Sequence, residues 1–259
     1  MHKLKIFVFI SYVFILSSVS HASTYEDSCY SIIDPIEGFN RKIFAFNLGI
    51  DKVIIRPIVG AYIKIVPVWT QNRVHNLFDN LTSPLTFVNN VAQGDGKGMS
   101  LTVGRFLVNT FLGLGGFLDF ATYFDLDQNK QTFSDTLSSY RVSYGAYVIL
   151  PLMGPTTARG VIGTIGDIGI DPLNYVFTRD QAIEYAIAKN VDLRIQYNDL
   201  IKATEEASVD YYSKVRSMHI QYISRRSIHC PVNQPLDYTL DDDIPDHNAN
   251  HSEEKNAKK

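Results

Sequence analysis

Residues 101–124 read LTVGRFLVNTFLGLGGFLDFATYF, and only Arg105 and Asp119 carry a charge in this stretch. Residues 142–166 read VSYGAYVILPLMGPTTARGVIGTIG and contain Arg159 as their single charged residue. Glycines interrupt the first stretch and prolines the second, so neither offers the ~20 clean apolar residues of a membrane-spanning helix. Glycine lets backbones bend and approach closely. The two stretches therefore predict apolar segments that face either a core or lipid.

Helical patterns flank these two stretches. The run Asp34-Pro-Ile-Glu37 predicts a helix start, with Asp34 as the N-cap, proline in the first turn and glutamate able to reach back to the cap. Apolar residues then recur at steps of three and four up to Ile50. Further helices are predicted over 69–81, 84–93, 101–112, 181–197 and 205–222, with a turn at 94–96. The predicted fold class is all-α, built from amphipathic helices.

Composition excludes several classes of protein. The chain has 259 residues, of which 45% are hydrophobic and 20% charged, with two cysteines and a formal net charge of −3. These values exclude intrinsic disorder, collagen, a coiled coil and a disulfide-dense scaffold. The negative net charge excludes a polybasic nucleic-acid binder, so no nucleic-acid partner is expected.

The N-terminus has the pattern of an export signal. Residues 1–22 combine Lys3 and Lys5, an apolar run and the small-residue end Ser20-His21-Ala22, which is typical of a cleaved signal peptide. A membrane anchor is the alternative. The predicted organisation is a signal peptide over 1–22, an N-terminal segment over 23–33, a helical domain over 34–223 and a polar, disordered tail over 224–259.

Motifs for chemistry are weak. Cys29 and Cys230 are an even pair that could form a disulfide in an oxidising compartment, or two separate thiols. The run Asp125-x-Asp127-x-Asn129 resembles the start of a calcium loop but has Lys130 where that loop needs glycine. No catalytic residue, metal site or cofactor is predicted.

Several ordered motifs resemble one known family. They are DPIEGFNR at 34–41, IFAFN at 43–47, NLTSP at 80–84, VNNVAQGD at 88–95, RFLVNTFLGLGGFLD at 105–119, SYGAY at 143–147 and LPLMGP at 150–155. Together they resemble the MlaA (VacJ) family of outer-membrane phospholipid-transport proteins. Many relatives are lipoproteins, whereas the residues before Cys29 do not form a lipobox.

The resemblance implies a ring-like bundle of amphipathic helices, embedded in one leaflet of the membrane around a central amphipathic channel. Such a protein lies in the periplasmic leaflet of the outer membrane. It takes phospholipid from the outer leaflet and passes it to a soluble periplasmic lipid carrier, in association with an outer-membrane porin trimer. No bond is broken, so the resemblance implies a protein that is not an enzyme.

Two sets of residues follow from this interpretation. The expected lipid-channel residues are Arg105, Asn109, Gly113, Gly115, Gly116, Asp119, Tyr144, Tyr147 and Arg159. The expected lid or hairpin residues, within a helix over 36–50, are Phe39, Asn40, Phe44, Ala45, Phe46 and Asn47.

Alternatives stay open for the roles of individual residues and for the function of the whole chain. The three charged channel residues either face the channel, because charges in membrane segments rarely face lipid, or are paired structural groups. Tyr144 and Tyr147 either lie at the level of the lipid head groups or pack in a core. For the whole chain, a soluble periplasmic lipid-binding module and a secreted hydrolase are the alternative functions.

Overall fold

The computed structural model of the protein describes residues 32–226. The predicted signal peptide, both cysteines and the tail from residue 227 lie outside these residues. The elements in chain order are α3 (Glu37–Ile50), the π-helix η1 (Asp51–Ile55), α4 (Arg56–Ile65), α5 (Val68–Gln93), α6 (Gly96–Phe111), the 3-10 helix η2 (Ala121–Phe124), α7 (Phe133–Ser139), β1 (Tyr147–Leu150), β2 (Gly154–Thr157), α8 (Ala158–Ile170), α9 (Leu173–Val176), α10 (Arg179–Gln196), α11 (Asn198–Ala207) and α12 (Tyr211–Arg226).

The first helix begins later than the sequence predicts. Ile36, not Asp34, precedes the first helical residue, and no side chain caps this end. The predicted N-cap role of Asp34 is therefore wrong. Its carboxylate instead accepts hydrogen bonds from Asn40 at 2.8 Å, from Tyr212 and from Arg216 at 3.3 Å. A buried carboxylate is stabilised more by three donors than by a local cap, and these donors lie on two different helices.

Pro57 and Pro84 both lie in continuous helical segments, although local sequence rules predict a helix break at proline. At Pro57 the helix continues, because the π-turn η1 opens the hydrogen-bond ladder just before it. At Pro84 the predicted separate helix start is wrong, since α5 runs through this residue without a break. The hydroxyl groups of Thr82 and Ser83 donate to the carbonyl of Asp79 in the turn before that proline.

Other predicted boundaries differ less. The turn at 94–96 is confirmed, because Gly94 ends α5 in the left-handed conformation with φ 71°. Helix α6 begins at Gly96, earlier than predicted, because Asp95 caps it by accepting from the amide of Gly98. The single helix predicted over 205–222 is wrong: α11 ends before Ser208 and α12 begins at Tyr211.

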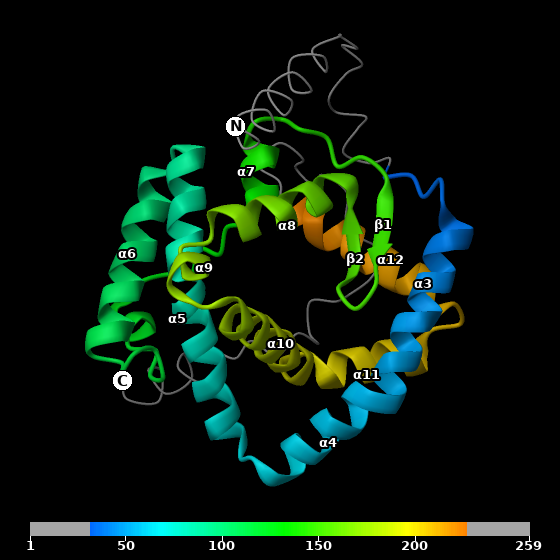
Figure 1. Ribbon diagram of the computed structural model, residues 1–259, viewed down its shortest axis with the longest axis horizontal. Helices are drawn as coiled ribbons and strands as arrows, with labels where there is room; N and C mark the ends of the chain where they lie inside the picture. The colour runs from blue at the N-terminus through cyan, green and yellow to red at the C-terminus, as the bar shows by residue number, and fades with distance from the viewer. Residues whose placement is uncertain (1–31, 227–259) are drawn as a thin grey trace, which may run out of the picture. The chain divides into compact units, whose positions relative to one another are not determined.

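Contacts between the elements of residues 32–226 form a closed circuit (Figure 1). Helix α3 contacts β1, β1 pairs antiparallel with β2, and β2 contacts α8. Helix α8 contacts α7 and α5, and α5 leads back through α4 and η1 to α3. Helix α10 contacts α4 and α5, and α12 contacts α11 and β2. The predicted helical, ring-like class is confirmed, with one short β-hairpin added.

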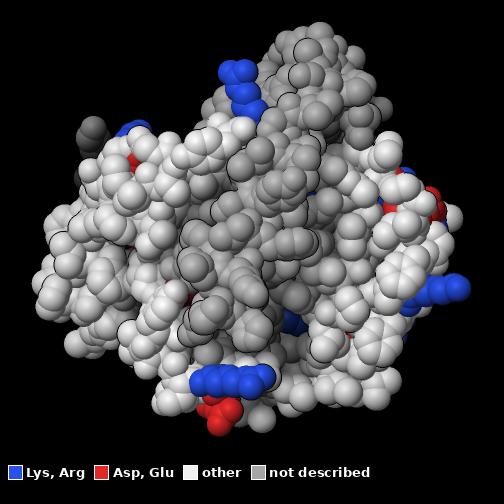
Figure 2. Space-filling view, turned by 45° about the horizontal axis from the view of Figure 1, so that its top comes forward, with Lys and Arg blue, Asp and Glu red and all other residues white. Residues whose placement is uncertain are grey.

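Burial within residues 32–226 is inverted relative to a water-soluble domain. Fifteen polar or charged side chains are buried but only seven hydrophobic ones, while 35 large hydrophobic side chains are exposed. A soluble domain shows the opposite, since its apolar side chains leave water. On the face in Figure 2, charged side chains are sparse over the described surface. The apolar side chains of this fold therefore need a partner other than a protein core.

Helix length alone does not supply a membrane span. Within residues 32–226 no individual helix is both long and apolar enough to cross a bilayer. The helical segments 37–65 and 68–93 have the required length and hydropathy only when taken together, and they are bent by 119° where they meet.

Candidate functional site

Helix α6 and the loop after it carry a network of charged and polar groups, here called the Asp119 cluster (Arg105, Asn109, Asp119 and Thr122). Both carboxylate oxygens of Asp119 accept from Nη2 of Arg105, at 2.9 and 3.0 Å. The amide of Asn109 donates to Asp119 at 3.0 Å, and its oxygen accepts from the backbone of Ala121 at 2.8 Å. The hydroxyl of Thr122 adds a bond of 2.6 Å. Each carboxylate oxygen thus has at least two donors.

The Asp119 cluster keeps its charges. Burial by itself would raise the pKa of Asp119, but the Thr122 hydrogen bond and the nearby Arg105 outweigh it, so the pKa lies below its ordinary value. The side chains are 12% exposed for Arg105 and 27% for Asp119. A pair of this kind fixes the direction of the loop after α6, because neither partner can turn away without leaving a charge unpaired.

The glycines of the loop let it fold back onto α5. Gly115 and Gly116 have φ of 77° and 107°, values that favour glycine. A Cβ on Gly116 would lie 2.4 Å from the side chain of Asn80, and one on Gly113 would lie 2.1 Å from the carbonyl of Leu118. The amide of Asn80 donates to the carbonyl of Gly115 at 3.1 Å. The loop is therefore held at a fixed position against α5.

This fixed loop presents apolar side chains outward. The exposed ones on it and at the adjoining end of α6 are Phe111, Leu112, Leu114, Phe117, Tyr123 and Phe124. Buried charges on one side and exposed aromatic rings on the other give the segment two faces. An amphipathic segment of this kind suits contact with acyl chains.

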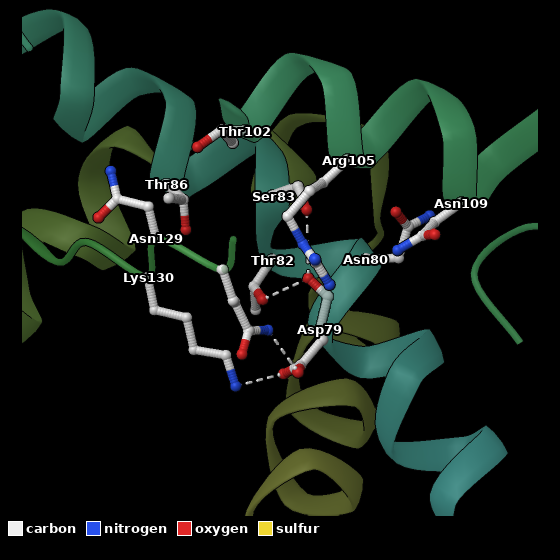
Figure 3. Close-up of a pocket in the computed structure, with 11 residues that line it drawn as sticks. Asp79, Asn80, Thr82, Ser83, Thr86, Thr102, Arg105, Asn109, Asn129 and Lys130 are labelled. Atoms are coloured by element: carbon white, nitrogen blue, oxygen red, sulfur yellow. Dashed lines mark hydrogen bonds and ion pairs between the residues drawn. The ribbon is translucent and has the colours of Figure 1, made fainter. Parts of the chain in front are cut away.

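Helices α5 and α6 face each other through polar side chains around a small cavity (Figure 3). Asp79 lies at its edge and accepts from Lys130 and Gln128, both at 2.8 Å. The volume open to a ligand is about 30 Å³, which is room for a water molecule and not for a lipid. Across the same helix pair, Asn90 donates to Thr102 at 2.9 Å. The interface is thus built from hydrogen bonds, as in helix pairs that lack a hydrophobic driving force.

The other predicted channel residues lie around the β-hairpin and the start of α8. Arg159 is 6% exposed, donates to the carbonyl of Val142 at 2.7 Å and stacks over the ring of Tyr144 at 4.0 Å. The hydroxyl of Tyr144 donates to the carbonyl of Ile223 at 2.9 Å. Tyr147 is fully buried and contacts Tyr212 edge to face, and burial raises the pKa of its hydroxyl group. Both predicted tyrosines therefore lie in the core of the hairpin region.

A cavity of about 200 Å³, here called the Arg159 cavity, opens beside this group. Helices α7, α8 and α12 and strand β2 form its walls. The residues that line it are Thr132, Ser134, Asp135, Ser138, Tyr144, Thr156, Thr157, Arg159, Gly160, Thr164, Asp167, His219, Tyr222, Ile223 and Arg226. It is larger than the small cavity between α5 and α6.

The predicted lid residues lie on two faces of α3. Phe39 and Phe46 are 58% and 52% exposed, and Ala45 is also exposed. Phe44 points the other way and contacts the rings of Tyr211 and Tyr212 at 5.2 and 5.6 Å. One face of the helix is thus available to lipid, and the other packs on α12.

Asn40 and Asn47 bind the free edge of β1. The amide of Asn40 donates to the carbonyl of Tyr147 at 3.0 Å, and its oxygen accepts from the amide of Ile149 at 3.0 Å. Asn47 donates to the carbonyl of Leu150 at 2.9 Å and accepts from the amide of Leu152 at 2.8 Å. Each side chain therefore imitates a neighbouring strand. We call these two residues the asparagine clamp.

The structure divides the predicted channel set into two groups. Arg105, Asn109 and Asp119 meet on α6 and its loop, whereas Tyr144, Tyr147 and Arg159 meet beside the hairpin. No hydrogen bond joins the two groups within the described part of the chain. The predicted disulfide lies outside the described residues.

Sequence patterns missed other buried polar groups. Asn80, Asn89 and Asn90 are among the buried side chains of α5, and Asp192 of α10 lies 2.7 Å from His75. The spacings between these asparagines are nine residues and one residue. A search for hydrophobic helix faces looks for apolar residues at steps of three and four, so it does not detect them. A search for asparagine within apolar helices would find them. Among residues 32–226, no group of three or more metal-ligating side chains is found.

Comparison with protein families gives a match over all of the described residues. The family model described as MlaA lipoprotein matches residues 32–226. This span begins near the first predicted motif and ends at the last residue of α12.

Individual proteins agree with the family match. An uncharacterised protein of Rickettsia typhi is 34% identical over 205 residues, which cover 72% of this chain and 82% of that protein. The Escherichia coli K12 protein named "Intermembrane phospholipid transport system lipoprotein MlaA" is 32% identical over 220 residues, which cover 82% of this chain and 87% of that protein. A solved chain from work on the structural basis for maintenance of bacterial outer membrane lipid asymmetry is 34% identical. It has a TM-score of 0.66 and covers 75% of this chain and 98% of that one.

Proposed function

The chain belongs to the MlaA family, and from this premise we propose that it removes phospholipid from the outer leaflet of the outer membrane and passes it to a periplasmic carrier. The protein is a component of intermembrane phospholipid transport that maintains lipid asymmetry. The observation that carries this function is the agreement of the family match, the named relative and the solved structure, each of which covers 75% or more of this chain.

The inverted burial gives the physical reason for a place in the outer membrane. Exposed apolar side chains occur along the helices, and those on the segment from α3 to α5 are Phe39, Phe46, Val53, Ile54, Ile58, Ile65, Val68, Trp69, Phe87 and Val91. Moving a fully exposed side chain of this size from water to lipid stabilises a protein by about 1.5–3 kcal/mol, and these partly exposed side chains contribute in proportion to the area that they bury. Backbone that is bent or broken is tolerated at membrane depth where protein covers it. We place these faces in the periplasmic leaflet.

An alkaline wash tests this placement. Membranes from cells that make the full chain are washed with carbonate at high pH, and the protein is expected to stay in the pellet until detergent is added. A soluble periplasmic protein serves as the control for complete release. Release of this chain without detergent would contradict the embedded placement and support a soluble lipid-binding module.

The path of the lipid is part of the proposal. Both carboxylate oxygens of Asp119 already accept hydrogen bonds, so the role of the Asp119 cluster is to hold the loop with Gly113, Gly115 and Gly116 against α5, where the loop forms a wall of the channel. Arg159 keeps unused hydrogen-bond donors and is the channel residue best suited to contact the polar part of a lipid. Tyr144 positions Arg159 by stacking against it.

Partners and chemistry follow from the family resemblance. We propose that the protein associates with an outer-membrane porin trimer and delivers lipid to a soluble periplasmic carrier, and that it breaks no bond. Transfer of an intact lipid needs only matched apolar and polar surfaces along the path, since the lipid enters and leaves with the same covalent structure.

The test of the function is the phospholipid content of the outer leaflet. In cells that lack this protein, surface-exposed phospholipid is expected to rise because its removal stops, and the full chain supplied in trans is expected to restore the wild-type level. The measurement is labelling of surface phospholipid by an added phospholipase or acyltransferase. An unchanged level in the deletion strain would remove the transport function.

A further inference from the structure

Arg159 is a buried cation without a carboxylate partner. The residue is 6% exposed, and none of the ion pairs among residues 32–226 includes it. Of the five N–H groups of its guanidinium, one hydrogen-bonds to the carbonyl of Val142, and Nε is buried without a partner. A buried charge without a counter-charge is destabilising, and the stack over Tyr144 at 4.0 Å offsets only part of that cost. The guanidinium of Arg159 therefore keeps N–H donors and a positive charge that an anion could use.

The Arg159 cavity gives such an anion room and further donors. Ser134 and Thr156 line it, and their hydroxyl groups hydrogen-bond to no described residue. Nε2 of His219 is also buried without a partner. Burial lowers the pKa of His219 to about 4, so at neutral pH the ring is uncharged and carries one N–H. These groups are suited to donate hydrogen bonds to an oxyanion.

The carboxylates of the cavity are already satisfied. Asp135 accepts from Arg226 at 2.6 Å. Asp167 accepts from the amide of Phe133 at 2.9 Å and from Asn89 at 3.1 Å, and burial raises its pKa. Asp167 also lies eight residues from Arg159 on α8, about 12 Å along the axis. The end of the cavity at Arg159 is therefore its positive end.

We propose that the Arg159 end of this cavity binds a phosphate group. The size of the cavity fits a phosphodiester with its glycerol and does not fit a whole phospholipid. Taking a phospholipid head group as the source of the phosphate rests on the proposed function; free phosphate is the other source. The positive first turn of α8 adds to the attraction, because an anion is stabilised at a helix N-terminus.

Titration calorimetry of the purified full chain in detergent micelles tests the proposal. The probes are inorganic phosphate and sn-glycero-3-phosphoethanolamine, each against sodium chloride of equal ionic strength. Arg159→Gln is expected to weaken binding about 10- to 100-fold, since hydrogen bonds to charged groups are lost. Arg159→Lys keeps the charge and is expected to recover part of the affinity. Arg225→Gln removes an exposed charge outside the cavity lining and is expected to leave binding unchanged.

Ser134→Ala keeps the test decisive if Arg159→Gln does not fold. It removes one free hydroxyl from the lining and is expected to weaken binding about three- to tenfold. Wild-type affinity in a folded Arg159→Gln would overturn the proposal, and so would wild-type affinity in Ser134→Ala where Arg159→Gln does not fold. A wild-type protein that binds neither probe would also overturn it.

The two probes identify the source of the phosphate. Tighter binding of the glycerophosphodiester supports a lipid head group. Binding of inorganic phosphate alone supports the anion site and overturns the lipid source. If the purified protein binds neither probe while cells that make it keep normal outer-leaflet phospholipid levels, this site is rejected and the transport function stands. The transport function is tested separately, by the outer-leaflet phospholipid level of the deletion strain.

Discussion

Replacing Asp119 by alanine is expected to lower the free energy of unfolding by about 3–5 kcal/mol, because it leaves Arg105 buried without its counter-charge. The same change removes acceptors from Asn109 and Thr122, so the loop after α6 loses its anchor. The measurement is the unfolding transition of the purified protein in detergent micelles. This effect is a large fraction of the total stability of an ordinary domain.

Two control variants distinguish the loss of the Arg105–Asp119 ion pair from the general effect of removing a charge. Asp127→Ala removes an exposed carboxylate nearby and is expected to change stability by less than about 0.5 kcal/mol. In the double variant Arg105→Met with Asp119→Leu, part of the lost stability is expected to return, since no buried charge is left unpaired. If Asp119→Ala unfolds like Asp127→Ala, the pair does not hold the loop.

The pH dependence of this pair has a defined sign. The pKa of Asp119 is lower in the folded protein than its ordinary value, so the carboxylate contributes stability above that ordinary pKa. The contribution is lost as the pH falls through the lowered value. The difference between wild type and Asp119→Ala is therefore expected to be constant near neutral pH and to shrink only in strong acid.

Deleting Ala45 and Phe46 is expected to change the rate of lipid transfer strongly by breaking half of the asparagine clamp. Asn40 and Asn47 are seven residues apart and lie within about 20° of each other around α3; removal of two residues turns Asn47 by about 200°. Asn47 then loses two hydrogen bonds to the chain at Leu150 and Leu152. At about 1 kcal/mol each, the equilibrium between the clamped and released helix shifts about thirtyfold.

Two variants test whether the clamp causes the effect. Phe46→Ala keeps the helical register and is expected to transfer lipid at nearly the wild-type rate, although it removes an exposed ring. Asn47→Ala removes the same two hydrogen bonds without a deletion and is expected to reproduce most of the change. Lipid transfer is measured between the protein in reconstituted vesicles and an acceptor. An unchanged rate in the deletion variant would end the assignment of α3 as a lid.

Sequence patterns predicted the local backbone features of the loop after α6. The glycines at 113–116 predicted a segment that bends, and two of them take the left-handed conformation that local sterics reserve for glycine. The sequence also showed that Arg105, Asp119 and Arg159 stand out as charges in apolar surroundings. Whether each was paired could not be predicted, because Arg105 finds a carboxylate 14 residues away and Arg159 finds none among the described residues.

Local rules failed where a distant partner outweighed them. A cap motif predicted that Asp34 begins the first helix, but the donors of Tyr212 and Arg216 lie 178 and 182 residues away in the chain. Proline rules predicted a break at Pro84, but the packing of α5 on α6 and the hydroxyl groups before the proline keep the helix continuous.

By itself, the sequence determined the helical class, the position of the two weakly charged stretches and, through its ordered motifs, the family. These features are local, because periodicity, glycine content and motif order need no knowledge of what lies across the fold. Only the tertiary structure decided which side of each helix is covered. It buries the asparagines, leaves the aromatic and aliphatic side chains outside, and isolates Arg159 beside a cavity. The reason is that hydrogen bonds such as Asn40 to Tyr147 join residues 107 positions apart, and such pairs form only when the chain has folded.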